Sequence, residues 1–487
     1  MRRSFLFLIA AAATAAAAAI AYVQTARAIR FEADLLPRPH VLMPSGAPSG
    51  VVFLVSDAKG WQAEDQALAE RLKGRGAAVV AIDLPSWLAK ATAAVDPKDD
   101  DCTYLTADLE DLSHRIQRAG GASVYRLPVV AGRGAGGAVA LGVVAQSPFA
   151  TIGRTVVVDP QAAVPMKTVL CSQAPRKPEA GGVVYGLQPG PLPDPVDAIF
   201  TPAADAAGRD HVDQLVREGF ALSVSAAGGS PLAALEAGID RALAAVQAPA
   251  GNGDLSDLPI VEVPAKGHAG SGTMAIILSG DGGWRDLDRQ IGDMLAAKGV
   301  PVIGLDSLKY FWSEKQPPQI AADLSRIIDH YAARWRAHQV ILAGYSFGAD
   351  AIPASYNRMK PEDKERIAEI ALLAPSASAD FVFEVTSWLS SFGLGGDDGV
   401  PTLPEIARIE PAKLQCFYGV DDDESICPQL KGKGIEIIST AGSHHFDGDY
   451  QRLADRILAG LAGRGTPARA TSGAAASEGA SETTAER

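Results

Sequence analysis

The chain contains one pattern of elements twice, and this duplication restricts the possible folds more than any other feature. An apolar run at 51–56 leads into Gly-Trp, and a second run at 275–279 leads into Gly-Trp again. Residues 130–136 and 342–348 correspond in the same way further along each copy. Both copies alternate short β-branched runs with helical patterns, which is typical of a mainly parallel sheet covered by helices. The sequence therefore predicts two tandem α/β domains.

The domain boundaries are predicted from breaks in this pattern. A length of 487 residues suits two domains. Gly, Asp and Pro interrupt the periodicity at 251–264, which predicts a linker between domains at 29–250 and 265–463. The segment 464–487 is rich in Ala, Ser and Thr, and we expect it to be a disordered tail.

The first residues indicate export. Arg2 and Arg3 precede an apolar run at 5–23 and an Ala-Arg-Ala sequence at 26–28. This order predicts a signal peptide at 1–28 and a periplasmic protein, with an inner-membrane anchor if the run stays uncleaved. The formal net charge of -13 argues against nucleic acid as a partner and favours a cationic substrate.

The four cysteines suit an oxidising compartment. Cys416 and Cys427 bracket a short acidic loop, and we predict a disulfide between them. Cys102 and Cys171 both lie in the first half, where a second disulfide is possible. Their spacing does not fit a C-x-x-C zinc or redox site, and we expect neither metal nor cofactor.

A nucleophile is indicated in the second copy. Residues 344–348 read Gly-Tyr-Ser-Phe-Gly, a G-x-S-x-G sequence that alone is common by chance. Here an apolar strand pattern precedes it and a helical segment follows, as the tight turn of an α/β-hydrolase requires. We predict that Ser346 is the nucleophile, the alternative being a simple helix N-cap.

An acid and a base follow in the order that this fold uses. Asp422 lies in an acidic loop just after a predicted strand, with Asp421 and Asp423 as alternative acids. The consecutive carboxylates lack the alternate spacing of a calcium loop. His444 follows the last predicted strand as the candidate base, with its neighbour His445 as the alternative.

A glycine-rich loop completes the candidate site. Residues 279–284 read Ser-Gly-Asp-Gly-Gly-Trp after the first strand of the second copy. We expect the backbone N–H of Asp281 or Gly282, together with that of Phe347, to stabilise the developing oxyanion.

The first copy lacks these groups. Gly134 stands where the second copy has Ser346, and Ser230 falls opposite His444. We therefore predict two tandem α/β-hydrolase-like domains of which the N-terminal one is degenerate. Residues 132–137 also match a G-x-G-x-x-G dinucleotide fingerprint, but they lie late in the unit and not at its first strand–helix turn.

Several segments together resemble the bacterial virulence protein VirJ family. They are residues 279–284, 310–313, 344–350 and 442–450, within a match from Val261 to Leu461. The double-length layout is similar to the AcvB branch. The resemblance implies an exported hydrolase of aminoacyl-phosphatidylglycerol, chiefly the lysyl form, with Ser346, Asp422 and His444 as its triad. It also implies a link to virulence and type IV secretion, so secretion-system proteins are possible partners.

The expected substrate is an aminoacylated phospholipid at the membrane surface. A lysyl ester carries two ammonium groups, which acidic residues around the site would favour. Trp388, Leu389 and Phe392 lie where these folds often have a lid. Two rival hypotheses are a general periplasmic esterase and a binding component of a secretion system. The predicted substrate-binding residues are Asp350, Trp284, Trp312 and Trp388.

Overall fold

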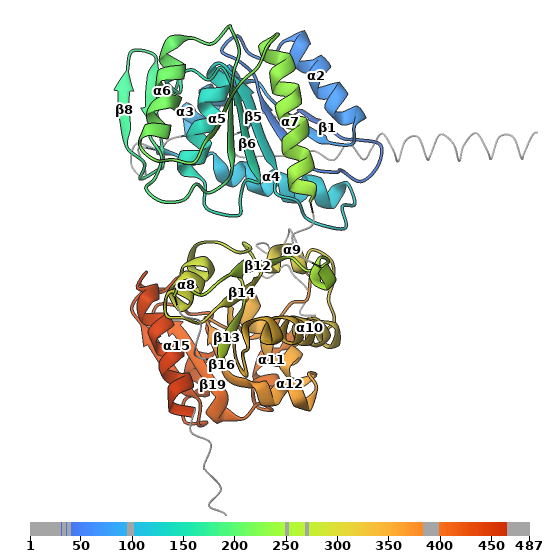
Figure 1. Cartoon of the computed structure of the whole chain (residues 1–487), viewed down its shortest axis with the longest axis vertical. Helices are drawn as coiled ribbons and strands as arrows, with labels where there is room; N and C mark the ends of the chain where they lie inside the picture. The colour runs from blue at the N-terminus through green and yellow to red at the C-terminus, as the bar shows by residue number, and fades with distance from the viewer. Residues whose placement is uncertain are drawn as a thin grey trace, which may run out of the picture.

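Two seven-stranded sheets form the framework of the chain (Figure 1). One lies in the N-terminal unit (residues 40–248) and the other in the C-terminal unit (residues 253–464). The structure is a computed structural model that describes Phe31, Leu36 and residues 40–94, 102–248, 253–267, 272–382 and 399–464. The predicted signal segment 1–28, the predicted tail from 465 onward, and Trp388, Leu389 and Phe392 lie outside the described residues.

The first sheet has the strand order β1-β3-β2-β5-β6-β10-β11. Its edge strand β1 pairs antiparallel with β3, and the remaining pairs are parallel. The central strands are continuous apolar runs buried on both faces, as a covered parallel sheet requires. The strand bounds are β1 His40–Leu42, β2 Val51–Val55, β3 Ala78–Ile82, β5 Val129–Arg133, β6 Arg154–Val158, β10 Val196–Phe200 and β11 Ser223–Ala226.

The second sheet repeats this topology strand for strand, with the order β12-β14-β13-β15-β16-β19-β20. Again only the edge strand β12 is antiparallel to its neighbour. The prediction of two tandem α/β-hydrolase-like sheets is confirmed. The strand bounds are β12 Ile260–Val263, β13 Thr273–Leu278, β14 Val302–Leu305, β15 Gln339–Tyr345, β16 Ile367–Leu373, β19 Leu414–Gly419 and β20 Glu436–Thr440.

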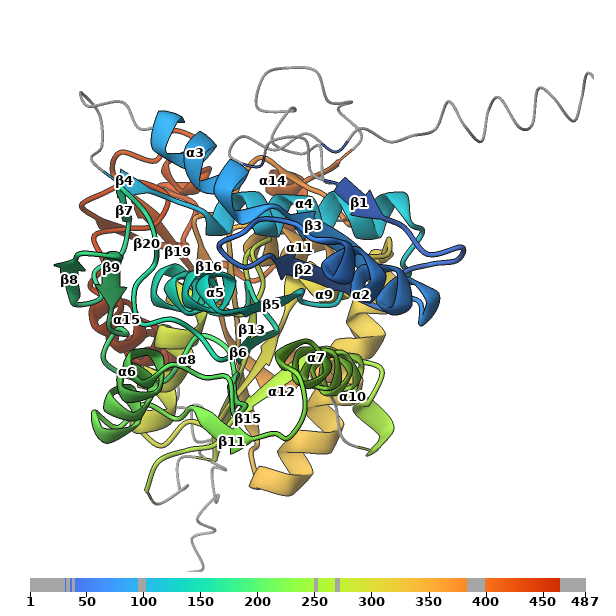
Figure 2. The same ribbon diagram turned by 90° about the horizontal axis from the view of Figure 1, so that it is seen from above.

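Helices cover both faces of each sheet. In the N-terminal unit, α2 (Ala63–Gly74) and α7 (Pro231–Gln247) pack on one face. The other face carries α3 (Leu84–Ala94), α4 (Thr106–Ala119), α5 (Ala135–Gln146) and α6 (Ala206–Arg217). Seen from above, α5 and α7 lie on opposite sides of this sheet (Figure 2).

In the C-terminal unit, α8 (Asp286–Ala297) and α15 (Tyr450–Arg464) pack on one face. The other face carries α10 (Pro317–Trp335) and α11 (Phe347–Asn357), on the right in Figure 1. The short elements of this unit are α9 Ser307–Tyr310, α12 Pro361–Arg366, α14 Thr402–Ile406 and the pair β17 Ser378–Ala379 with β18 Val400–Pro401.

One predicted boundary is wrong. Ile260–Val263 lies inside the segment predicted to be a linker, but it forms β12 and pairs antiparallel with β14. This apolar run is short and lies among glycines and prolines, so the sequence pattern resembles a loop. The pairing with β14 shows that it is a strand. The other domain boundaries stay a prediction.

Two disulfides are present. Cys416–Cys427 is the predicted pair, and Cys102–Cys171 joins the short parallel strands β4 (Cys102–Thr103) and β7 (Val169–Leu170). The hairpin β8 (Arg176–Glu179) and β9 (Gly182–Tyr185) follows β7. Both disulfides fit an exported protein. Among the helices in the described part of the chain, none combines the length and apolar character needed to cross a membrane.

Candidate active site

Ser346 lies at the turn between β15 and α11. Its φ of 49° is unusual for a residue other than glycine, and holding it there costs about 1–3 kcal/mol. Two glycines allow the close approach that the turn needs. A Cβ on Gly344 would lie 2.6 Å from the backbone of Gly348, and one on Gly348 would lie 2.3 Å from the carbonyl of Leu278. Ser346 is at the N-cap position, but its side chain makes no capping hydrogen bond.

The turn brings the Ser346 hydroxyl to a histidine and an acid. His444 Nε2 lies 2.9 Å from Ser346 Oγ, and His444 Nδ1 lies 3.1 Å from Asp422 Oδ2. The Asp422 side chain is 3% exposed and that of His444 is 32% exposed, so the acid is shielded while the imidazole edge remains accessible. This is the arrangement of a nucleophile, a general base and a carboxylate that orients the base.

The alternative acid and base have other surroundings. His445 Nδ1 lies 2.8 Å from the hydroxyl of Tyr345, and Asp421 and Asp423 are exposed on the loop after β19. The structure therefore brings His444 and Asp422 to Ser346 and leaves the other three candidates outside this hydrogen-bonded chain. Within the described ranges, no group of three or more His, Cys, Asp or Glu side chains is arranged to hold a metal ion.

The internal repeat shows which residues of the N-terminal unit correspond to the loop at 279–285, called the oxyanion loop from here on. Ser56 Oγ accepts the N–H at the start of α3, and Ser279 Oγ accepts the N–H at the start of α9. Gly134, with φ 55°, occupies the turn that Ser346 occupies in the C-terminal unit. The residue after Ser56 is Asp57, whereas the residue after Ser279 is Gly280.

Asp57 shows where the two backbone donors of this fold converge. Its Oδ1 accepts the N–H of Ala58 at 2.7 Å and the N–H of Ala135 at 2.9 Å. Asp281 and Phe347 are the corresponding residues of the C-terminal unit. The carboxylate oxygen in the first copy thus marks the position that an oxyanion would take in the second, and it favours Asp281 over Gly282 as the first donor.

In the N-terminal copy the Asp57 carboxylate therefore occupies the oxyanion position, and the nucleophile is also missing. A Cβ at Gly134 would lie 2.4 Å from Asp57 Oδ1. Asp57 was not predicted from the sequence, although an acidic residue at the position of Gly280 distinguishes the first copy from the second. The G-x-G-x-x-G match at 132–137 forms this turn between β5 and α5, in place of the first strand–helix turn that a dinucleotide site uses.

Two predicted substrate contacts are wrong. Trp284 is 6% exposed and packs in the core between β14 and α8, over Gly292 and Gly304. Trp312 is 1% exposed and is covered by the N-terminal unit. The apolar rings of both tryptophans are buried where no substrate reaches them. Trp388, the third predicted aromatic contact, lies outside the described residues.

Asp350, the predicted acidic contact, is also buried. Its carboxylate accepts the backbone N–H of Ser376 at 2.6 Å and the Ser376 hydroxyl at 2.8 Å. Burial raises the pKa of Asp350 to about 8, although the two hydrogen bonds from Ser376 act in the opposite direction. Asp350 therefore holds the loop after β16 and is not open to a substrate.

The raised pKa of Asp350 predicts a stability that depends on pH. In the unfolded chain this carboxyl would titrate near its ordinary value of about 4, so between that pH and 8 only the folded state holds the proton. Stability attributable to Asp350 is then greatest at the acidic end of this window and falls as pH rises. We expect Asp350→Asn, which cannot ionise, to raise Tm relative to wild type by about 5 °C at pH 9 and much less at pH 5. Thermal unfolding followed by circular dichroism measures this difference, and equal shifts at both pH values would contradict it.

A comparison with known protein families matches the second unit. Residues 272–465 match the family described as bacterial virulence protein (VirJ). No curated protein matches the chain. The strand order of the two sheets and the turn at Ser346 are themselves those of an α/β-hydrolase-like fold.

Solved structures similar to the chain include three esterases. The esterase Pf2001 of Pyrococcus furiosus is 15% identical, with 44% of this chain and 96% of that chain covered and a TM-score of 0.30. Est1E of Butyrivibrio proteoclasticus, bound to ferulic acid, is 12% identical, with 43% and 97% covered and a TM-score of 0.31. A thermophilic esterase from Thermogutta terrifontis is 14% identical, with 43% and 94% covered and a TM-score of 0.32. The family to which this chain is similar is thus the bacterial virulence protein VirJ family, and the similarity covers residues 272–465 of the C-terminal unit.

Proposed function

We propose that this chain is an exported serine hydrolase that cleaves the aminoacyl ester of lysyl-phosphatidylglycerol in the periplasm. The products are lysine and phosphatidylglycerol. The observation that carries the proposal is the 2.9 Å contact between Ser346 Oγ and His444 Nε2, with Asp422 behind the histidine. A serine on a strained turn with a base and an orienting acid is equipped for acyl transfer.

The first half of the reaction forms an acyl-enzyme. Ser346 Oγ attacks the lysyl carbonyl carbon while His444 Nε2 takes the hydroxyl proton. The N–H groups of Asp281 and Phe347 stabilise the oxyanion of the tetrahedral intermediate. When this intermediate collapses, the bond to the glycerol oxygen breaks, and His444 returns the proton to that oxygen as phosphatidylglycerol leaves.

Water completes the reaction. His444 takes a proton from a water molecule, whose oxygen attacks the carbonyl carbon of the lysyl ester on Ser346. Collapse releases lysine and returns the proton to Ser346 Oγ. Asp422 keeps His444 in the tautomer that accepts at Nε2 and stabilises the imidazolium formed in each step.

The charge around the site favours a cationic acyl group. Loops at the carboxyl edge of a parallel sheet gather on one side of it, and here they follow β13, β16, β19 and β20. Arg452 pairs with two of the acids on the last of these loops, which leaves a negative balance. Such a field attracts the two ammonium groups of a lysyl ester. The exposed acidic residues on these loops are Asp281, Asp380, Asp421, Asp423, Glu424, Asp447 and Asp449.

Export and membrane contact complete the proposal. The disulfides Cys102–Cys171 and Cys416–Cys427 are of the kind that persists outside the cytosol. The substrate would be met at the outer surface of the inner membrane, where its headgroup is accessible to a periplasmic enzyme.

Vesicles with different aminoacyl headgroups test this function. The chain is incubated with vesicles of lysyl-phosphatidylglycerol or alanyl-phosphatidylglycerol, and the free amino acid is quantified over time. We expect lysine to be released at least about 10-fold faster than alanine at low salt, with a smaller ratio at high salt because ions screen the acidic loops.

Two results would change the assignment. Equal rates for the two lipids would indicate a general esterase. Cleavage of p-nitrophenyl acetate without release of either amino acid would keep the serine hydrolase and exclude the lipid substrate.

A further inference from the structure

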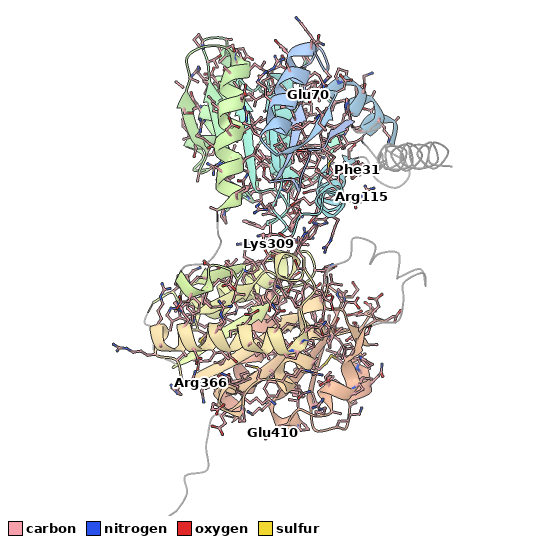
Figure 3. All side chains as sticks on the ribbon, turned by 90° about the vertical axis from the view of Figure 1, so that its right-hand side faces the viewer. Phe31, Glu70, Arg115, Lys309, Arg366 and Glu410 are labelled. Carbon is pink, nitrogen blue, oxygen red and sulfur yellow. A yellow bond between two sulfur atoms is a disulfide. The ribbon has the colours of Figure 1, made fainter. Side chains whose placement is uncertain are left out.

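The two units share a buried contact at the carboxyl edge of the second sheet, the edge at which the candidate active site lies. The ring of Trp312, which follows α9, lies under the guanidinium of Arg118 at 3.8 Å, and its Nε1 donates to the carbonyl of Ala122 at 2.8 Å. Tyr125 and Leu308 complete this cluster, and each is 1% exposed. In Figure 1, α4 lies on the side of the N-terminal unit that faces α9, and Figure 3 shows Lys309 of α9 at the boundary. The N-terminal unit is thus docked next to loops that begin at the carboxyl edge of β13 and β14.

An ion pair across this boundary reaches the oxyanion loop. Arg285 ends the 279–285 loop, and its Nη1 donates to Glu110 Oε1 at 2.8 Å and to the Thr151 hydroxyl at 3.0 Å. Both of these acceptors belong to the N-terminal unit. The Arg285 guanidinium also lies against the loop itself, because a Cβ at Gly282 would be 2.3 Å from Arg285 Nη2. Glu110 therefore restrains the loop through a side chain that packs on its backbone.

The first copy closes the same loop by different means. Gln62 corresponds to Arg285, and its Nε2 donates to the carbonyls of Lys59 at 2.9 Å and Gly60 at 3.3 Å. These hydrogen bonds lie within the loop of its own unit. In the C-terminal unit the corresponding residue, Arg285, instead makes hydrogen bonds to the N-terminal unit.

The backbone directly after this loop, at the first residue of α8, is strained. Asp286, directly after Arg285, has a φ of 43°. That conformation costs a non-glycine residue about 1–3 kcal/mol and persists only when its surroundings hold it. The ion pair between Arg285 and Glu110 is adjacent to Asp286, so it can hold the backbone in this strained conformation.

We propose that the N-terminal unit positions the oxyanion loop of the C-terminal active site, with Glu110 as the positioning residue that acts through Arg285. The degenerate copy then has a role that needs no chemistry of its own. It holds the Asp281 N–H where the intermediate forms, and catalysis in the second unit depends on the first. This inference rests on the hydrolase activity proposed above.

A matched pair of variants in the full chain tests the inference. Glu110→Gln removes the charge that holds Arg285, whereas Asp197→Asn removes an equally shielded ion pair inside the N-terminal unit. The side chains of Arg285 and Glu110 are 24% and 19% exposed, and those of Arg154 and Asp197 are 25% and 14% exposed. Hydrolysis of p-nitrophenyl acetate gives kcat and KM, and hydrogen exchange of the amides of residues 280–285 reports on the loop.

We expect Glu110→Gln to lower kcat by about 10- to 100-fold with KM changed less than about twofold, because a misplaced donor affects the transition state more than the bound ester. Exchange in the loop should become about 10-fold faster. Asp197→Asn should change neither quantity. Unchanged kcat and exchange in Glu110→Gln, or equal losses in both variants, would overturn the inference. If the wild type does not cleave the ester, the proposed function fails, and loop exchange alone decides whether Glu110 positions the loop.

Discussion

Replacing Ser346 with alanine is expected to lower kcat for lysine release by about 10⁵- to 10⁶-fold, to a rate that binding and the oxyanion donors alone sustain. The reason is that Ser346 carries the hydroxyl that lies 2.9 Å from His444 Nε2, and alanine removes it. Alanine fits the turn as well as serine does, because both have a Cβ at the same positive φ, so Tm should stay close to that of the wild type. Release of free lysine from lysyl-phosphatidylglycerol vesicles measures the effect.

Ser355→Ala is the matched control for this variant. Ser355 lies on α11, the helix that follows Ser346, is buried, and donates to the carbonyl of Ala351 at 2.7 Å. Its loss should cost about 1 kcal/mol of stability or less and leave kcat within about twofold of the wild type. Full activity in Ser346→Ala would rule out the acyl-enzyme mechanism.

His444→Ala and His445→Ala are expected to differ by about four orders of magnitude in kcat, although the residues are neighbours. His444 contacts both Ser346 and Asp422, so its removal takes away the base and should lower kcat by about 10⁵-fold or more. His445 Nδ1 contacts the Tyr345 hydroxyl, so its removal should disturb only the loop and lower kcat less than about 10-fold. Initial rates with p-nitrophenyl acetate measure both.

The reverse order of these two effects would identify His445 as the base and require a rearranged loop. Similar large losses in both variants, with lowered Tm, would indicate that the loop after β20 collapses when either ring is removed. Only the reversed order would contradict the assignment of the base to His444.

The sequence by itself determined the parts of this protein that depend on local chemistry. The elbow at Ser346 was predictable because its turn needs glycines at fixed positions after a strand, and those requirements appear within a few residues. The duplication was predictable for a similar reason, since each buried strand must be an apolar run and each turn keeps its glycines. The order of Ser346, Asp422 and His444 followed from the order of strands in this fold.

The tertiary structure decided which side chains meet and which are buried. Asp422 is distinguished from its acidic neighbours only by the direction that the loop gives it. Trp284 is buried between β14 and α8, and Trp312 is buried by the N-terminal unit, which is distant in the sequence. Glu110 and Arg285 are 175 residues apart, so no local pattern links them. Asp57 fills the first copy's oxyanion position because Ala58 and Ala135 converge on it. Local patterns specify strands and turns, but contacts between them depend on the packing of the whole chain.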